Sequence, residues 1–290
     1  MARRLFPGAK LHNRQRLAGG VSADVYRLDL VLADEQHRSV VLRKHGSRYG
    51  GHPVALEYQL LDVLHRHDIP VPKPLLADSS GQLLEYPFLV MSFVPGSTGI
   101  PAGSAETCIQ RAAELLVDIH DTSTSGLPAL PARLNPLPEV FDYLPPGREW
   151  QPLVGFLADL DDTGYRGSRK LLHGDYWPEN IIWENGSISA VLDWEDAATG
   201  DPLSDLACSR LEIRYLFGIT GMQCFTRAYQ TRNQVSQERL ALWQIYVAAA
   251  AYHFMGQWGL PKEREAHMRH VALASIQEAG ETLMAGVELV

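Results

Sequence analysis

The chain has few cysteines and no long apolar run, and both absences exclude classes of protein. Its three cysteines, Cys108, Cys208 and Cys224, are odd in number and far apart, a spacing that favours neither a disulfide framework nor a metal knuckle. They indicate thiols of a reducing compartment, so we expect a cytoplasmic protein. No stretch approaches the roughly 18 consecutive apolar residues of a membrane span, and no apolar run follows Arg3 and Arg4. We therefore expect neither a membrane segment nor a signal peptide.

Positive charge is also scarce. The chain has 26 lysines and arginines against 34 aspartates and glutamates, which gives a formal net charge of −8. A nucleic-acid partner requires a clustered basic face, so this balance argues against one. The 290 residues, 46% hydrophobic and 21% charged, have the composition of a globular protein of one large or two modest domains.

The first hundred residues carry strand patterns around a single helical pattern. The β-branched strand runs cover residues 25–30, 39–43 and 88–94. Leucines recur at helical spacing over residues 56–64, before a proline-rich stretch that cannot continue a helix. Because the last strand run stops at Pro95-Gly96, we predict a β-rich N-terminal lobe over residues 1–95.

Beyond Pro95-Gly96 the patterns become helical. The apolar spacing predicts helices over residues 106–120, 202–217, 220–233 and 238–257. A connection over residues 127–146 carries six prolines and is predicted to be mostly loop. We therefore predict an α+β protein whose second part, residues 96–290, is a mainly helical lobe.

Two carboxylates and an amide are spaced around a predicted hairpin. Apolar runs flank Asn185-Gly186, which is a strong hairpin turn signal. Asp175 and Asn180 precede the first run and Asp193 follows the second, so the hairpin brings them to one end. Oxygen ligands of this kind suit Mg²⁺, and a carboxylate left off the metal can accept a hydroxyl proton. Alone, Asp175 or Asp193 would more simply be a turn or cap residue; the joint pattern favours chemistry.

The order His-Gly-Asp, then Asn, then Asp after a hairpin resembles the aminoglycoside phosphotransferase and choline kinase-like family, a branch of the two-lobed protein-kinase-like fold. The resemblance implies that Asp175 is the catalytic base, while Asn180 and Asp193 hold Mg²⁺ on the phosphates of ATP or GTP. It also implies that Asp205 anchors the catalytic loop. Protein kinases have arginine in place of Gly174 and Asp-Phe-Gly in place of Asp193-Trp194-Glu195, and both differences favour the small-molecule branch.

The same resemblance makes residues 1–95 a nucleotide-binding lobe and residues 96–290 the lobe that holds the catalytic and substrate-binding residues. Gly20 and Ser22 lie in a loop that would cover the phosphates. Arg43 stands where the family most often has lysine, and strand alternation sends Lys44 to the opposite face, so only one of the two can reach the nucleotide. Glu57 is the expected ion-pair partner of Arg43, the alternative being a solvated surface residue.

Met91 and Phe93 would lie in the hinge strand whose backbone contacts the adenine edge. On the acceptor side, Glu195, Asp196 and Glu212 would form a negative wall that attracts a cationic acceptor, or else a solvated face.

One further group of residues invites a binding role. An aromatic cage for a quaternary amine would be built from Trp243, Tyr246, Tyr252, Phe254 and Trp258. One helical face holds Trp243, Tyr246, Ala250 and Phe254, however, which favours core packing.

Several functions remain open at this stage. The favoured one is a kinase that transfers a γ-phosphoryl group to a small-molecule hydroxyl, either on an antibiotic or on choline, ethanolamine, homoserine or a ketosamine. The alternative is a pseudokinase that binds nucleotide without turnover, for which the support is Arg43 in place of lysine. The acceptor and the oligomeric state do not follow from the sequence.

Overall fold

The computed structural model describes residues 2–17, 23–46, 51–101, 105–137 and 139–287. The predicted phosphate-loop residues Gly20 and Ser22 lie outside these ranges. The chain folds into two compact units. The first comprises Met1–Gly99, Ser125–Ala129 and Asn180–Asp196, and the second comprises Ile100–Thr124, Leu130–Glu179 and Ala197–Val290. The proposed lobe boundary after residue 95 stays a prediction.

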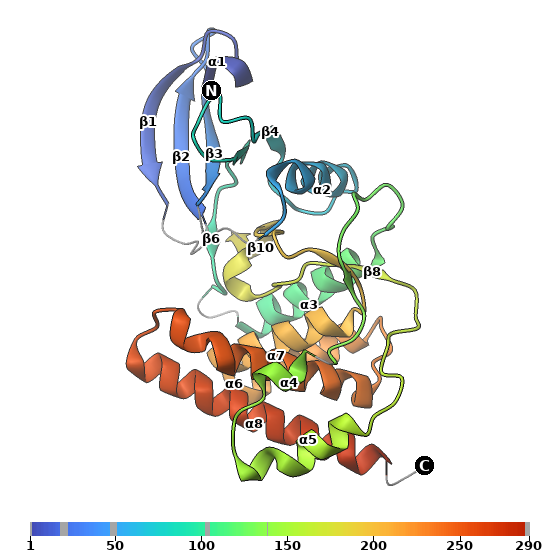
Figure 1. Ribbon diagram of the computed structural model, residues 1–290. Helices are drawn as coiled ribbons and strands as arrows, with labels where there is room; N and C mark the ends of the chain where they lie inside the picture. Colours follow the sequence, from blue (N-terminus) through green and yellow to red (C-terminus); the bar gives the residue numbers. More distant parts are fainter. Residues whose placement is uncertain (1, 18–22, 47–50, 102–104, 138, 288–290) are drawn as a thin grey trace. The chain divides into compact units, whose positions relative to one another are not determined.

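The first unit is built on an antiparallel sheet with the strand order β1-β2-β3-β5-β4 (Figure 1). Its strands are β1 (Lys10–Arg16), β2 (Ala23–Val31), β3 (His37–His45), β4 (Pro74–Asp78) and β5 (Phe88–Ser92). Alternate residues of β2, β3 and β5 turn Leu30, Val40 and Phe88 into a common core, as expected for a sheet with one buried face. Helix α2 (Val54–Arg66) packs on β4 and β5, and a short α1 (Ala2–Leu5) precedes β1.

A small second sheet in the same unit contains the predicted hairpin. Strands β9 (Ile181–Glu184) and β10 (Ser187–Val191) pair antiparallel, and β6 (Ser97–Thr98) adds to β9. The turn residues Asn185 and Gly186 have φ angles of 51° and 76°. Positive φ at both positions is what a two-residue hairpin turn with the favoured twist requires, so the Asn-Gly signal is explained by backbone geometry.

The second unit is mainly helical, with one small sheet of order β7-β11-β8. Its helices are α3 (Ala105–Asp121), α4 (Val140–Tyr143), α5 (Gln151–Ala158), α6 (Leu203–Gln230), α7 (Gln237–Phe254) and α8 (Lys262–Val287). Its strands are β7 (Ala132–Arg133), β8 (Lys170–Leu172) and β11 (Ala198–Gly200), and short 3-10 turns cover Arg148–Trp150, Pro178–Asn180 and Met255–Gln257. The described part of the proline-rich connection, apart from β7 and α4, is loop, as predicted.

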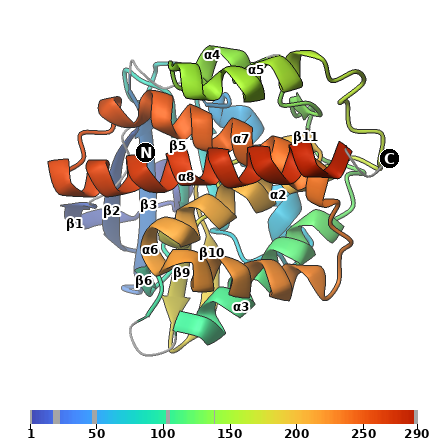
Figure 2. The ribbon, with the colours of Figure 1, turned by 90° about the horizontal axis from the view of Figure 1, so that it is seen from below.

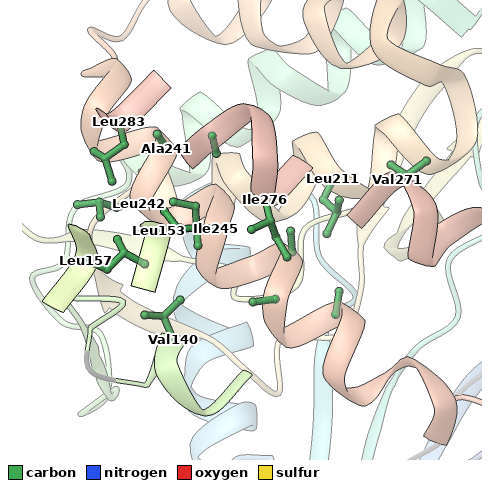
Figure 3. Close-up of a cluster of buried hydrophobic side chains, with 14 of the residues drawn as sticks. Val140, Leu153, Leu157, Leu211, Ala241, Leu242, Ile245, Val271, Ile276 and Leu283 are labelled. Carbon is green, nitrogen blue, oxygen red and sulfur yellow. The ribbon is translucent and has the colours of Figure 1, made fainter. Parts of the chain in front are cut away.

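Helices α6, α7 and α8 form the core of the second unit together with α4 and α5 (Figure 2). Leu153 and Leu157 of α5 meet Ile245 of α7 and Ile276 of α8 in this core (Figure 3). Gly218, with φ 65° and ψ −168°, interrupts α6, which accounts for the two separate helical patterns in the sequence. No helix among the described residues is both long and apolar enough to cross a membrane.

Candidate active site

A buried arginine lies at the centre of the first unit's polar cluster. The alternation of β3 buries Arg43, which is 8% exposed, and turns Lys44 to the other face, where its Nζ lies 3.1 Å from Asp24. Arg43 Nη1 donates to Glu57 Oε1 on α2 at 2.6 Å. Burial acts to raise the pKa of Glu57, but the contacts with His45 and Arg43 outweigh it and the pKa lies below its ordinary value. The structure thus brings together the predicted pair Arg43 and Glu57.

The second terminal nitrogen of Arg43 is shared by two more carboxylates. Arg43 Nη2 donates to Asp193 Oδ1 at 2.8 Å and also to Glu195 Oε2. Asp193 adopts a φ of 64°, a left-handed conformation that non-glycine residues rarely hold outside functional or strained sites. Glu195, expected in an acceptor wall, therefore lies on the guanidinium of the predicted nucleotide site instead.

The hairpin brings Asn180 and Asp193 to the same end of β9 and β10. The Leu192 N–H donates to the Asn180 carbonyl at 2.8 Å, which closes the hairpin one residue before Asp193. Val191 N–H donates to the Pro70 carbonyl, and the indole of buried Trp194 donates to Val191 O, so the segment is held on both sides.

This pair of side chains fits Mg²⁺. Asn180 and Asp193 offer an amide and a carboxylate oxygen, and Mg²⁺ takes one or two carboxylates and completes its shell with phosphates and water. A cage made wholly by the protein is absent from the part of the chain that the structure describes, where no three His, Cys, Asp or Glu side chains form a metal cluster. A Mg²⁺ site with some ligands from the protein and the rest from phosphate would agree with both the two side chains and the missing cage.

In the second unit, Asp205 holds the segment that carries Asp175. The fully buried carboxylate of Asp205 accepts from His173 N–H at 2.7 Å and from Gly174 N–H at 3.0 Å. His120 Nε2 lies 3.3 Å from the same carboxylate. Burial acts to raise the pKa of Asp205, yet the hydrogen bond and charge of His120 outweigh it and leave the pKa below its ordinary value. The backbone N–H groups of His173 and Gly174 both donate to this one ionised carboxylate, and these hydrogen bonds fix the loop immediately before Asp175.

Further acids lie around Asp175. Burial, with the charges of Asp175 and Glu179, raises the pKa of Glu212 to about 8. Glu212 is one helical turn from Cys208 on α6, and burial and the charge of Asp175 also raise the pKa of the Cys208 thiol. This face of α6 therefore lies in the electrostatic neighbourhood of the proposed base.

The remaining predicted residues are not brought into these clusters. Met91 is buried in β5 opposite Val41 of β3, and the ring of Phe93 lies 4.2 Å from the guanidinium carbon of Arg27. Asp196 is exposed in the first unit, whereas Glu212 belongs to the second. Sequence reasoning named neither Arg133, which donates to Gly174 O at 3.3 Å, nor His120. Both lie next to the predicted loop only through the fold.

Curated relatives share part of the chain. Viomycin phosphotransferase of Streptomyces vinaceus is 30% identical over 162 residues, which are 47% of this chain and 54% of that protein. Aminoglycoside 3'-phosphotransferase of Streptomyces fradiae is 25% identical over 65% of this chain and 76% of its own length. The mouse acyl-CoA dehydrogenase family member 10 is 26% identical, and the match spans 62% of this chain and 18% of that protein. The chain thus spans about a fifth to about half of the length of the curated relatives it matches first.

Solved structures share the fold over nearly the whole chain. An aminoglycoside phosphotransferase in complex with AMP-PNP and hygromycin B superposes with a TM-score of 0.63, at 17% identity, over 93% of this chain and 95% of that chain. A macrolide 2'-phosphotransferase of Brachybacterium faecium gives 0.61 at 21% identity, over 93% and 94%. The predicted kinase-like fold, with an antiparallel sheet in its N-terminal part and a mainly helical C-terminal part, is confirmed.

The order of the motif residues and their setting on a hairpin and a braced loop agree with the family that the sequence resembles. The sequence pattern of the phosphotransferase enzyme family matches residues 13–243, well over half of the 290 residues, and the chain belongs to this family.

Proposed function

We propose that the chain transfers the γ-phosphoryl group of ATP or GTP to a hydroxyl group of a small molecule. The observation that carries the proposal is the buried Arg43, paired with Glu57 of α2 and with Asp193 at the end of the hairpin. A guanidinium held in this way presents a permanent charge whose planar fork also matches phosphate oxygens. Arg43 would hold the nucleotide phosphates as the lysine of other kinases does.

Asn180 and Asp193 would hold Mg²⁺ on these phosphates. When bound, the ion supplies positive charge that offsets the charge of the transferring phosphoryl group. Residues 91–93 of the hinge strand, together with Gly20 and Ser22, would complete the nucleotide site, as the resemblance implies. We expect the reaction in the cytoplasm, where nucleoside triphosphates and reduced thiols are found.

Asp175 would orient the acceptor hydroxyl and accept its proton. The backbone N–H groups of His173 and Gly174 donate to Asp205. The carboxylate of Asp175 is therefore attached to a backbone that is held in place. Little covalent chemistry is left to the protein in phosphoryl transfer, and the rate depends on positioning and on electrostatic stabilisation.

The acceptor would be a small hydroxyl compound. The names of the relatives point to antibiotics as their substrates, namely viomycin, aminoglycosides and macrolides, and amino alcohols or amino sugars are the metabolic alternative. An ammonium group on the acceptor would be attracted to the charges of Asp175 and Glu179, which help to keep Glu212 protonated near neutral pH.

A nucleotide-binding module without turnover is the second candidate. The observation in its favour is that Glu195 joins Asp193 on Arg43, so that Glu195 competes with phosphate for the cation. Against it, the proposed base and both proposed metal ligands are present.

The test is release of ADP or GDP, measured by a coupled assay with Mg·ATP and Mg·GTP. The acceptor panel holds aminoglycosides, viomycin, macrolides, amino alcohols, homoserine and ketosamines, and Asp175→Asn serves as the blank. Turnover that requires an acceptor and is absent from the blank supports the kinase. Nucleotide-induced thermal stabilisation without turnover on any acceptor supports the non-catalytic module. A protein that neither turns over nor binds nucleotide contradicts both.

A further inference from the structure

Arg133 lies against the segment that carries the proposed base. Its strand β7 runs parallel to β11, with Gly200 opposite Arg133 in the register. A Cβ at Gly200 would lie 1.9 Å from the Arg133 carbonyl oxygen, so the glycine allows β7 to lie tightly on β11. From this position Arg133 Nη1 donates to the carbonyl of Gly174 at 3.3 Å. Gly174 immediately precedes Asp175, so the guanidinium lies next to the catalytic loop.

No carboxylate of the described residues forms a direct ion pair with Arg133. Within the described ranges the side chain makes one hydrogen bond, to an uncharged carbonyl, and no ion pair within 4.0 Å. Arg239 and Arg214 of the same unit differ, because each pairs directly with a carboxylate, Asp201 and Glu278 respectively. A half-buried guanidinium with one of its five N–H groups engaged retains donors for a bidentate anion.

The charge of Arg133 reaches side chains on two helices. It acts to lower the pKa of Asp205 and Cys208 on α6 and of Tyr246 on α7. These side chains belong to different elements, so the charge of Arg133 acts on α6 and α7 as well as on the loop. Its hydrogen bond to Gly174 places the guanidinium one residue from Asp175, which the proposed acceptor must approach.

Aromatic side chains lie in the same neighbourhood. The ring centroids of Tyr143 and Tyr246 are 6.0 Å apart, and those of Tyr143 and Phe254 are 5.3 Å apart. Tyr246 donates to Glu139 Oε2 at 2.9 Å, and Phe254 is 36% exposed. Trp243 is buried and half-buried Tyr246 packs against the core, as expected from the sequence, while Tyr246 and Phe254 also offer partly accessible apolar surface.

We propose that Arg133 binds a carboxylate of the acceptor, and that Tyr143, Tyr246 and Phe254 contact the acceptor's apolar body. The proposal rests on the proposed function and adds the substrate class, a hydroxy acid with an apolar or aromatic portion. A singly charged carboxylate matches one guanidinium without a direct ion pair, whereas a doubly charged phosphate would be repelled more strongly by Asp175 and Glu179. An acceptor that also carries an ammonium group would place that group toward these two carboxylates, because Glu212 keeps its proton near neutral pH.

The experiment compares matched acceptors that differ only in charge. Hydroxy acids with and without an α-amino group, and with and without an aryl group, are each paired with their primary amide. For the wild type, R133K and R133M, kcat is measured together with the KM for the nucleotide and the KM for the acceptor. The control is R227M, which removes an exposed arginine from α6. Thermal denaturation shows whether each variant is folded.

We expect an acid to be preferred over its amide by at least tenfold in kcat/KM. In R133M the value for the acid should fall by about 10- to 100-fold, mainly through the acceptor KM, because a hydrogen bond to a charged group is lost. The amide should be unaffected, R133K should restore part of the preference, and R227M should behave as the wild type.

Two results would overturn the assignment of Arg133. An equal fall in kcat for acid and amide in R133M would mean that Arg133 only braces the loop at Gly174. Turnover of neutral or purely cationic acceptors without preference for any acid would exclude a carboxylate site, while leaving the proposed kinase intact. A chain that releases no ADP or GDP with any acceptor fails at the proposed function instead.

Discussion

The two units order their charged groups in different ways. In the first, one guanidinium gathers three carboxylates, so that Glu57, Asp193 and Glu195 share the single positive charge of Arg43. In the second, Asp205 is satisfied chiefly by backbone N–H groups of the loop, while Asp175, Glu179 and Glu212 remain in a negative neighbourhood. Paired carboxylates hold the cation Arg43 in place, whereas the hydrogen bonds to Asp205 fix the backbone before Asp175, the proposed base.

The difference has a consequence for ligands. Polyanionic phosphates would require the positive charge of Arg43, and Glu195 would have to release Arg43 for phosphate to bind there in its place. A hydroxyl acceptor would require a positioned carboxylate, and further ionised carboxylates nearby disfavour its charged, proton-accepting form. Substitutions that remove one charged group at a time, from the Arg43 cluster or from the residues around Asp175, test whether the two groups have these different roles.

The largest effect should come from Asp175 in the second unit. Asp175→Asn keeps the size of the side chain but removes the proton acceptor, so turnover should fall by about 10²- to 10⁴-fold. Nucleotide affinity, measured by calorimetry, should change less than about twofold, because the phosphate-binding residues belong to the other cluster. Asp161→Asn, at an exposed position of the same unit, is the matched control. Turnover at the wild-type rate in the Asp175 variant would refute its role as the base.

Removal of the cation should test the first cluster. Arg43→Met leaves Glu57 buried without its main countercharge, so the free energy of unfolding should fall by about 3–5 kcal/mol. Arg43→Lys should lose less of the free energy of unfolding, because lysine keeps the positive charge. It should still lose some, because lysine lacks the planar fork of the guanidinium. Urea denaturation measures both, with Lys44→Met on the opposite face of β3 as the control, expected to cost less than about 1 kcal/mol. A loss below 1 kcal/mol in R43M would show that the cluster does not hold the unit together.

The pH dependence of stability in acid should reveal the contribution of Asp205, which holds the loop before Asp175. The pKa of Asp205 lies below its ordinary value of 3.8 in the folded state, so its carboxylate stabilises the protein above about pH 4. That contribution is lost as the pH falls below 3.8 and through the folded-state pKa. Asp205→Asn should therefore lower the unfolding temperature at pH 7 and show a shallower decline below pH 4.

The Asp205 variant should also reduce kcat more than nucleotide affinity, since its backbone partners precede Asp175. Asp118→Asn, whose carboxylate is 51% exposed, is the control for thermal denaturation measured against pH. An unchanged acid slope in D205N, with the protein folded, would contradict this account.

The smallest effect should come from Glu212. Its pKa is raised to about 8 from 4.5, so the folded protein keeps a proton that the unfolded chain releases. Raising the pH from about 5 to 8 therefore favours unfolding. Glu212→Gln cannot ionise and should remove this decline, a difference of a few degrees in the unfolding temperature. Glu281→Gln, exposed on α8, is the control and should retain the wild-type slope. A wild-type slope in E212Q as well would show that Glu212 is already ionised at pH 5.

Much of the fold followed from local patterns, and the exceptions have physical reasons. Helix α2 and strands β2, β3 and β5 agree with the predicted segments because their apolar residues alternate or recur at helical spacing. Strand β1 was not predicted, since all seven of its residues are exposed and no alternation marks it. Helix α8 was also missed, although Val271, Ile276 and Leu283 are buried at helical spacing among many polar residues and alanines.

The candidate site divides in the same way. The sequence alone determined the motif order Asp175, Asn180, Asp193, the hairpin between the last two, and the alternation that separates Arg43 from Lys44, because each depends on neighbours along the chain. Only the tertiary structure decided that Glu195 meets Arg43 across 152 residues and that Arg133 meets Gly174 across 41. Such contacts depend on which elements pack together, and the packing of separate elements is a property of the whole fold that no local spacing encodes.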